Sequence, residues 1–259
     1  MQTTMSPSSF TVTQDKIQEY RKNGFVHIPG VISKEEAAEF REVALELSRK
    51  AADLKHGYKS NVFDQLVNVW RENADIRRLT LHPHVTRAAS ALAGIPLRLW
   101  HDQTLIKQPH NRTATEFHQD APYWPHGNSP NSLSIWIALC DVPVERGCMT
   151  FIPGSFERTG TPQQDLVDAK SLFGICPEMG WLPRVTLPLR AGDCTFHHGY
   201  CAHMAGSNDT DDPRVVHAVI FMDATTTYST AIRKSHIVTD PLGLREGQAL
   251  DGEIFPLVK

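Results

Sequence analysis

The side chains best suited to chemistry are His118 and Asp120, two residues apart, and His203 and Arg214, which follow far downstream. Two imidazoles and one carboxylate can occupy three neighbouring positions on one metal ion and leave the remaining positions open. That donor set is typical of non-haem Fe(II) oxygenases, which bind a co-substrate and dioxygen at the open positions. The Arg214 guanidinium has the charge and planar shape to bind a carboxylate through two hydrogen bonds.

A predicted strand over residues 113–118 carries the first part of this pattern. Residues i and i+2 of a strand point to the same face, so His118 and Asp120 can converge on one ion. The His-x-Asp triplet is short enough to occur by chance, and the alternative is a surface histidine beside a solvated aspartate. His203 is preferred as the third ligand. His198 is the competing candidate, although a packed or supporting role is favoured for it.

Arg214 opens a run of apolar residues, 214–221, that is predicted to be a buried strand. A hairpin around the small-residue turn at 205–208 would bring His203 close to Arg214, within reach of one co-substrate molecule. A buried guanidinium needs a partner. That partner is either the carboxylate of a co-substrate or an internal salt bridge, for which the candidates are Asp209, Asp211 and Asp212.

Length, charge and cysteine content restrict the class of protein. The 259 residues predict a disordered segment over 1–12 and one domain over 13–259. A net charge of −3 without long runs of one sign argues against nucleic acid or an anionic membrane as a partner. We find no signal-peptide pattern and no apolar run long enough to span a bilayer. The five cysteines form no CxxC pair, which favours reduced, structural thiols in a cytoplasmic protein over a zinc site.

The order of predicted elements favours a mainly β fold with flanking helices. Helices are expected from Thr13 to Gly24, from Ser33 to about Ala52 and over 85–93, with a strand over 25–28 between the first two. From residue 96 onward, short β-rich runs alternate with Pro, Gly and Asn turns, which is typical of a sandwich or barrel. Residues 155–183 and 225–250 fit neither pattern and are expected to form lids or binding loops.

Four blocks of residues, in order along 15–223, resemble the phytanoyl-CoA dioxygenase family of Fe(II)/2-oxoglutarate oxygenases. The opening block is residues 20–32, which contain Asn-Gly-Phe-Val-His-Ile-Pro-Gly. The second is Phe-His-Gln-Asp-Ala-Pro-Tyr-Trp at 117–124. The third runs from Ser-Ile-Trp-Ile-Ala-Leu at 134–139 to Ile-Pro-Gly-Ser at 152–155, and the fourth from Gly192 to Arg214.

This resemblance implies a double-stranded β-helix, the cupin-like jelly roll, with N-terminal α-helices and a core over about 96–223. It implies iron on His118, Asp120 and His203, and 2-oxoglutarate with its distal carboxylate on Arg214. It further implies that the 2-oxoglutarate pocket is lined by Gln103, Thr115 and Trp136. Lys107 is another candidate for that pocket, and its alternative is an ordinary exposed lysine.

The resemblance also implies the reaction, in which dioxygen and 2-oxoglutarate oxidise a C–H bond of a small organic molecule and release succinate and CO2. Hydroxylation is the expected outcome; epimerisation, ring closure and desaturation remain open. Asp120 favours oxygenation, because related halogenases have a small residue at that position. No basic cluster indicates a coenzyme A handle, and tailoring of a secondary metabolite is favoured.

Aromatic side chains near the metal motif and in the 155–183 segment are candidates for the walls of a substrate pocket. They are Tyr123, Trp124, Phe173 and Trp181. Their alternative role is packing within a lid. Two other classes of protein also remain open at this point: a jelly-roll enzyme that uses zinc or another divalent ion without oxidation, and a ligand-binding protein without catalysis.

Overall fold

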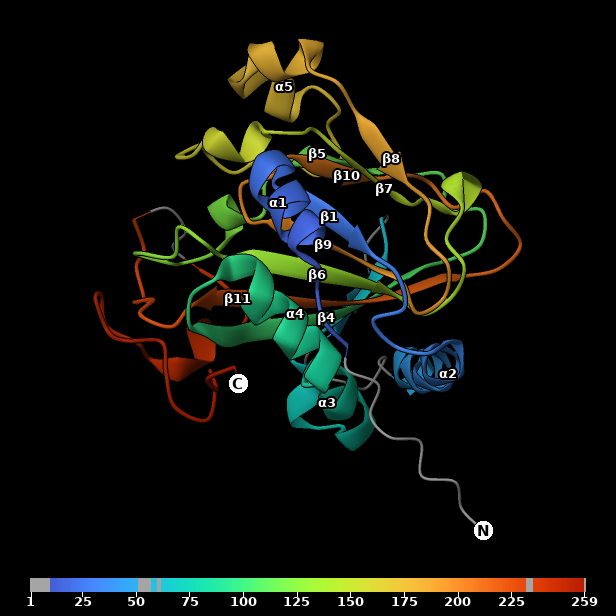
Figure 1. Cartoon of the computed structure of the whole chain (residues 1–259), viewed down its shortest axis with the longest axis horizontal. Helices are drawn as coiled ribbons and strands as arrows, with labels where there is room; N and C mark the ends of the chain where they lie inside the picture. Colours follow the sequence, from blue (N-terminus) through green and yellow to red (C-terminus); the bar gives the residue numbers. More distant parts are fainter. Residues whose placement is uncertain (1–9, 51–56, 60–61, 232–234, 259) are drawn as a thin grey trace.

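Two antiparallel β-sheets face each other in the computed structural model, which describes residues 10–50, 57–59, 62–231 and 235–258 (Figure 1). Within these residues the large sheet has seven strands in the order β1-β9-β6-β11-β4-β3-β2, and the small sheet has four in the order β5-β10-β7-β8. This arrangement confirms the predicted mainly β jelly roll with flanking helices.

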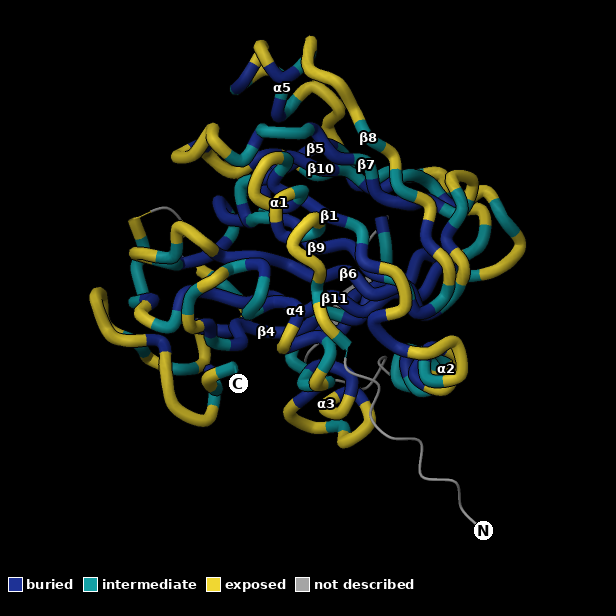
Figure 2. The backbone as a smooth tube through the Cα atoms, in the orientation of Figure 1, coloured by how far each residue is buried: buried dark blue, intermediate teal, exposed yellow. Residues whose placement is uncertain are grey.

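The strands have the following bounds. The large sheet contains β1 (Phe25–Ile28), β9 (Cys194–His198), β6 (Leu133–Ala138), β11 (Arg214–Asp223), β4 (Leu97–Lys107), β3 (Asp64–Val67) and β2 (Gly57–Lys59). The small sheet contains β5 (Thr115–His118), β10 (His203–Ala205), β7 (Met149–Phe151) and β8 (Val185–Leu187). Strands β6 and β11 are buried along their whole length at the centre of the molecule (Figure 2).

Helices α2, α3 and α4 pack against the large sheet on the side away from the small sheet, α1 lies beside edge strand β1, and a fifth helix lies beyond the small sheet (Figure 1). The first four are α1 (Gln14–Asn23), α2 (Lys34–Lys50), α3 (Ala74–Thr80) and α4 (Pro83–Ala93), and the fifth is α5 (Ser171–Ile175). Short 3-10 helices are η2 (Val69–Arg71), η3 (Ala121–Tyr123), η4 (Val144–Arg146), η5 (Ser155–Glu157), η6 (Pro177–Trp181) and η7 (Asp240–Leu242).

Local sequence signals explain the helix ends. The capping box at the start of α2 is present: Glu36 N–H donates to Ser33 Oγ at 3.1 Å, and Ser33 N–H donates to Glu36 Oε2 at 2.9 Å. The buried face of α2 is formed by Ala37, Phe40 and Ala44, as the helical spacing predicts. Helix α1 ends at Gly24, whose φ of 80° is the left-handed conformation that glycine adopts without strain.

Some predicted boundaries differ from the structure. The end of the second helix, expected at about Ala52, lies outside the described residues, as does most of the segment predicted to be disordered. Phe10 lies within that segment, yet its ring stacks on His84 at 4.5 Å, so order begins earlier than residue 13. Strands β2 and β3 and helix α3 were not predicted, because their sequences are short and lack a clear period.

A layer of buried polar side chains joins the helices to the outer face of the large sheet. Asp102 Oδ2 accepts hydrogen bonds from Trp70 N–H and Thr80 Oγ1, both at 3.0 Å. The two ring nitrogens of His217 contact the hydroxyls of Thr80 and Thr104, at 2.9 and 3.1 Å. Burial raises the pKa of Asp102 to about 7 and lowers that of His217 to about 3. Both groups are therefore neutral in weak acid.

We expect the free energy of unfolding of the metal-free protein to decrease as the pH falls from about 6.5. Burial lowers the pKa of His101, His126 and His217 to about 3, so the unfolded chain binds three protons that the folded protein does not. Asp102 opposes this between its ordinary pKa and about 7, because it keeps its proton in the folded state. These three histidines and Asp102 together give a difference of two protons, which corresponds to roughly 3 kcal/mol per pH unit, and His203, whose pKa is also lowered, adds to this slope.

Denaturant titrations between about pH 7 and pH 5 measure this slope. The variant His217→Gln should show a shallower slope than the parent, since it lacks one of the three histidines. A free energy of unfolding that does not change over this pH range would contradict the expectation.

Candidate active site

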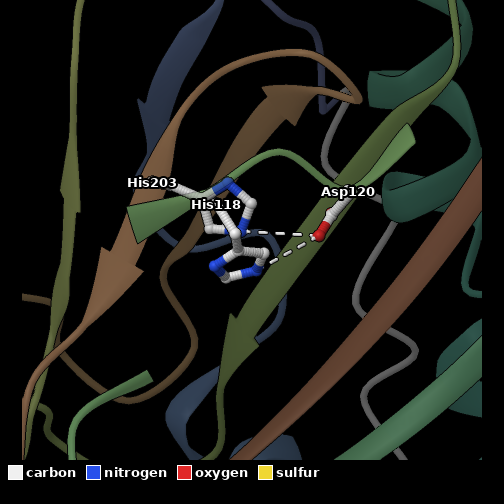
Figure 3. Close-up of side chains that lie close together, drawn as sticks. All are labelled: His118, Asp120 and His203. Carbon is white, nitrogen blue, oxygen red and sulfur yellow. Dashed lines mark ion pairs between the residues drawn. The ribbon is translucent and has the colours of Figure 1, made fainter. Parts of the chain in front are cut away.

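Three predicted ligands converge at one end of the small sheet. His118 Nε2 lies 3.5 Å from Asp120 Oδ1, and His203 Nε2 lies 3.6 Å from the same oxygen (Figure 3). One ligand atom from each residue lies within 4.8 Å of the other two. A metal ion about 2 Å from each donor fits this spacing.

Strand pairing explains why the two imidazoles meet. Strands β5 and β10 are antiparallel neighbours, and His118 and His203 are directly opposite each other in the register. Their ring centroids are 4.3 Å apart. Asp120 follows β5 by two residues, at the start of η3, and its carboxylate completes the group.

The hydrogen bonds around the three side chains favour the form that binds a metal. His118 Nδ1 lies 2.7 Å from the Glu116 carbonyl oxygen, and His203 Nδ1 lies 2.9 Å from that of Cys201. A carbonyl oxygen only accepts, so each Nδ1 carries the proton and each Nε2 presents a lone pair. Burial and the neighbouring imidazoles hold the pKa of His203 well below its ordinary value, which keeps that ring neutral.

Asp120 is held as a carboxylate with one oxygen directed to the two histidines. Its Oδ2 accepts from Ser134 Oγ at 3.0 Å and contacts His197 Nε2 at 3.1 Å, so Oδ1 remains for a metal. Burial alone would raise the pKa of Asp120, but the surrounding imidazoles, His203 first and then His118 and His197, hold it well below its usual range. His197 therefore supports the Asp120 carboxylate, a role that the sequence did not reveal.

We expect Ser134→Ala to weaken Fe(II) binding by roughly 10-fold, because it removes one of the two donors that orient the Asp120 carboxylate. Metal titration of the two proteins measures the change. Ser132→Ala is the matched control: Ser132 is buried nearby, and its hydroxyl has no hydrogen-bond partner among the described residues. Equal affinities in the parent and Ser134→Ala would show that Ser134 does not support the metal.

One cavity of about 330 Å³ opens from the three ligands into the space between the sheets. Five of the residues singled out in the sequence line it together with the triad: Gln103, Thr115, Tyr123, Trp136 and Arg214. The predicted hairpin between His203 and Arg214 is wrong. Strand β10 pairs with β5 and β7 in the small sheet, whereas β11 pairs with β4 and β6 in the large one. The two residues reach the cavity from opposite sheets.

Arg214 is buried, with 1% of its surface exposed, and has no carboxylate partner among the described residues. Its Nη1 donates to the Gly147 carbonyl oxygen at 2.8 Å, its guanidinium lies 5.4 Å from the Trp136 ring centroid, and its Nε has no hydrogen-bond partner there. Burial lowers the pKa of Arg214 to about 10, so the side chain stays charged at neutral pH. A buried cation without an anionic partner is costly, so this position is suited to an anion from outside the chain.

The internal salt bridges considered for Arg214 are absent from the described residues. Asp212 pairs with Arg146 at 3.1 Å, Asp211 pairs with His110 at 2.9 Å, and Asp209 accepts from a serine hydroxyl. The alternative of an exposed Lys107 is also wrong. Its side chain is buried, and Nζ donates to the backbone carbonyl oxygens of Thr113 and Gly206. Burial lowers the pKa of Lys107 to about 7.

Several candidates lie away from the cavity. His198 Nε2 contacts the Pro130 carbonyl oxygen at 2.9 Å, and its Nδ1 accepts from Tyr200 N–H, so both nitrogens are used outside the metal group. Trp124 packs behind η3 against His126. Phe173 packs edge-on against Phe117 outside the small sheet, and Trp181 is 91% exposed. These three aromatic side chains do not line the cavity.

Other cavity residues were missed in the sequence. They include Phe63, Gln65, His101, Leu166 and His236. Of these residues, only His101 could have been predicted, because residues two apart on a strand share a face and Gln103 was already expected in the pocket. The other residues lie on strands that were not predicted or in segments with no predicted element, where the sequence does not indicate which way a side chain points.

Comparison with known proteins decides the family. The sequence model described as "Phytanoyl-CoA dioxygenase (PhyH)" matches residues 20–216, which is most of the chain. The chain belongs to the phytanoyl-CoA dioxygenase family. Mouse peroxisomal phytanoyl-CoA dioxygenase is 26% identical over 231 residues, which cover 81% of this chain and 67% of that protein. A mouse phytanoyl-CoA dioxygenase domain-containing protein is 32% identical over 125 residues, which span less than half of either protein, 46% and 43%.

Two solved structures are similar to this chain over nearly its whole length. The non-haem α-ketoglutarate-dependent carbocyclase SnoK from nogalamycin biosynthesis is 35% identical, with a TM-score of 0.84, over 96% of this chain and 97% of that one. The epimerase SnoN, solved with Fe3+, α-ketoglutarate and nogalamycin RO, is 38% identical, with a TM-score of 0.82, over 95% and 98%.

The family and these neighbours establish the chain as an Fe(II)/2-oxoglutarate-dependent dioxygenase. Iron, 2-oxoglutarate and dioxygen are the cofactor and co-substrates of that class. This assignment replaces the two alternatives of a non-oxidative metal enzyme and a ligand-binding protein. In the described part of the chain, no helix has the length and apolar character needed to cross a membrane.

Proposed function

We propose that the chain holds Fe(II) on His118, Asp120 and His203, binds the distal carboxylate of 2-oxoglutarate with Arg214, and oxidises a C–H bond of a small organic molecule. The observation that supports this is the meeting, in one cavity, of a metal-binding triad and a buried guanidinium without a carboxylate partner. When bound, iron and 2-oxoglutarate supply the oxidation by dioxygen and release succinate and CO2.

The side chains of the cavity have separate tasks in this proposal. Arg214 anchors and orients the diacid, and the Trp136 ring packs against the guanidinium and shields it from water. Thr115 and Gln103 line the space between the two sheets, where they can bind the oxygens of 2-oxoglutarate. Tyr123 lines the cavity from η3, beside the ligands, on the substrate side.

The reaction outcome that the comparisons favour is ring closure or epimerisation in the tailoring of a secondary metabolite. The carbocyclase SnoK and the epimerase SnoN align with nearly the whole chain at 35% and 38% identity. A hydroxylase relative, the L-proline trans-4-hydroxylase of Streptomyces griseoviridis, is 25% identical over 252 residues. Hydroxylation, the outcome expected from sequence, therefore becomes the second candidate within the same chemistry.

The test has two stages. Anaerobic addition of Fe(II) and 2-oxoglutarate should produce the weak visible absorption band of the iron chelate. Oxygen is then admitted with nogalamycin RO as the probe, and succinate and the organic product are measured. A product two hydrogens lighter indicates ring closure or desaturation, which NMR of the product distinguishes, an isomer of equal mass indicates epimerisation, and a product one oxygen heavier indicates hydroxylation. Absence of both the band and succinate would refute the proposed function.

A further inference from the structure

A β-bulge in β4 turns His101 toward the cavity. The register between β4 and β11 pairs Ile220 with His101 and Phe221 with Leu99, so Trp100 is left without a partner. Leu99 lies in the core on the helix side of the sheet, whereas His101 lines the cavity. Regular alternation would place both side chains on the same face. Bulges commonly lie next to active sites and redirect a side chain in this way.

His101 and Arg214 lie toward opposite ends of the paired strands. Arg214 is opposite Lys107, and His101 is opposite Ile220, six residues further along β11. At the rise of an extended strand, this separation is about 20 Å. A five-carbon diacid bound to Arg214 is much shorter than this distance. The end of the cavity beside His101 therefore remains available for the molecule that is oxidised.

The hydrogen bonds of His101 leave its Nε2 as an acceptor without a partner among the described residues. Nδ1 lies 3.2 Å from the Asp102 carbonyl oxygen, which only accepts, so Nδ1 carries the proton of the neutral ring. Nε2 is then an acceptor, and it is buried without a hydrogen-bond partner among the described residues. Burial, followed by the neighbouring His236, lowers the pKa of His101 to about 3, so the ring does not become a cation in weak acid.

The surroundings of His101 combine a second polar group with an apolar wall. The His236 ring centroid lies 5.5 Å from that of His101. His236 Nδ1 accepts from Val238 N–H at 3.2 Å, so its Nε2 carries a proton. The nearby cavity wall includes Val67, which is opposite Gln103 in the register, and Ile237, which follows His236. A buried acceptor beside an apolar wall suits a hydroxyl group carried on an apolar ring system.

We propose that His101 is a specificity-determining residue whose Nε2 accepts a hydrogen bond from a hydroxyl group of the organic substrate. This inference rests on the proposed function, because that function assigns the Arg214 end of the cavity to 2-oxoglutarate. A substrate in which the hydroxyl is methylated leaves the buried acceptor unmatched and binds more weakly, since an unpaired buried polar group is costly.

Two small probes test this on metal-free protein: 2-naphthol, which has the hydroxyl, and 2-methoxynaphthalene, which has the same rings without it. In protein labelled with 15N-histidine, 2-naphthol should shift the resonance of the unprotonated His101 Nε2, and the methoxy compound should not. We expect 2-naphthol to bind roughly 10-fold more tightly. Similar affinities, an unchanged His101 resonance, or no binding of 2-naphthol would overturn the proposal.

Variants extend the test. His101→Phe should bind both probes equally, and His101→Gln should recover part of the preference because its amide oxygen accepts. His27→Phe is the matched control, since His27 lies on edge strand β1, pairs with Asp193 and does not line the cavity. If His101→Phe fails to fold, the 15N shift in the parent remains decisive.

The two proposals fail differently. A protein that prefers 2-naphthol but forms no succinate retains the His101 assignment and refutes the proposed function. A protein that forms succinate but binds the two probes equally retains the proposed function and refutes the His101 assignment.

Discussion

Asp120→Ala will abolish turnover and weaken Fe(II) binding by more than about 100-fold, beyond the effect of losing a supporting hydrogen bond. Asp120 supplies the one anionic donor of the triad, and its Oδ1 lies within 3.6 Å of both imidazoles. Its removal also leaves Ser134 and His197 without the carboxylate that they now contact. His118→Ala should have a comparable effect on turnover.

The fold should survive these substitutions, because both side chains lie at the cavity wall and outside the hydrophobic clusters that join helices to sheet. Circular dichroism checks the fold, metal titration measures affinity, and succinate release measures turnover. Asp209→Ala is a suitable control, since the Asp209 side chain accepts a hydrogen bond from the nearby Ser207 hydroxyl and does not line the cavity. Full activity in Asp120→Ala or His118→Ala would remove the iron assignment.

Arg214→Met will raise the apparent KM for 2-oxoglutarate by at least about 100-fold, and the KM for the organic substrate much less. A carboxylate bound to a buried guanidinium loses roughly 2–5 kcal/mol when the cation is removed. Arg146→Ala provides the control, because it removes a partly buried arginine that pairs with Asp212 and does not line the cavity. Unchanged kinetics for 2-oxoglutarate in Arg214→Met would refute the anchoring role.

The stability of the same variant distinguishes an anchoring arginine from a structural one. Breaking an internal salt bridge lowers stability by roughly 3–5 kcal/mol. Arg214 has no such partner among the described residues, so the ligand-free Arg214→Met protein should be as stable as the parent or slightly more stable. Conversely, saturating 2-oxoglutarate should raise the melting temperature of the Fe(II)-loaded parent and not that of the variant.

The chemistry of the site was predictable because it depends on residue type and short spacing. His118 and Asp120 lie two residues apart, and the run that follows Arg214 is too apolar for a surface strand. The choice of His203 over His198 depended instead on the small-residue turn that follows His203 and on the resemblance to the family. The sheet that each strand joins is a long-range property, and for this reason the hairpin between His203 and Arg214 was wrong. Nothing in residues 205–213 specifies that the next strand crosses to the opposite sheet.

Side-chain direction in irregular segments was the other limit. The sequence shows that Tyr123 and Trp124 are aromatic, but the turn of η3 places Tyr123 on the cavity and Trp124 behind it. The bulge at Trp100 could not be predicted either. Counting alternate residues from Leu99 places His101 on the helix side of the sheet, whereas counting back from Gln103 places it on the cavity side. Such irregularities arise from the packing of distant strands.

The short strands that carry the ligands have a consequence for local unfolding. Strands β5 and β10 contain four and three residues, whereas the paired β4 and β11 contain eleven and ten. Short strands with few buried contacts open at lower free energy than long central ones. A metal ion shared by His118 and His203 would fasten two adjacent strands together. We expect amide hydrogen exchange in β5 and β10 to slow sharply on metal binding, while that of β11 hardly changes. Iron would then stabilise the small sheet against local unfolding.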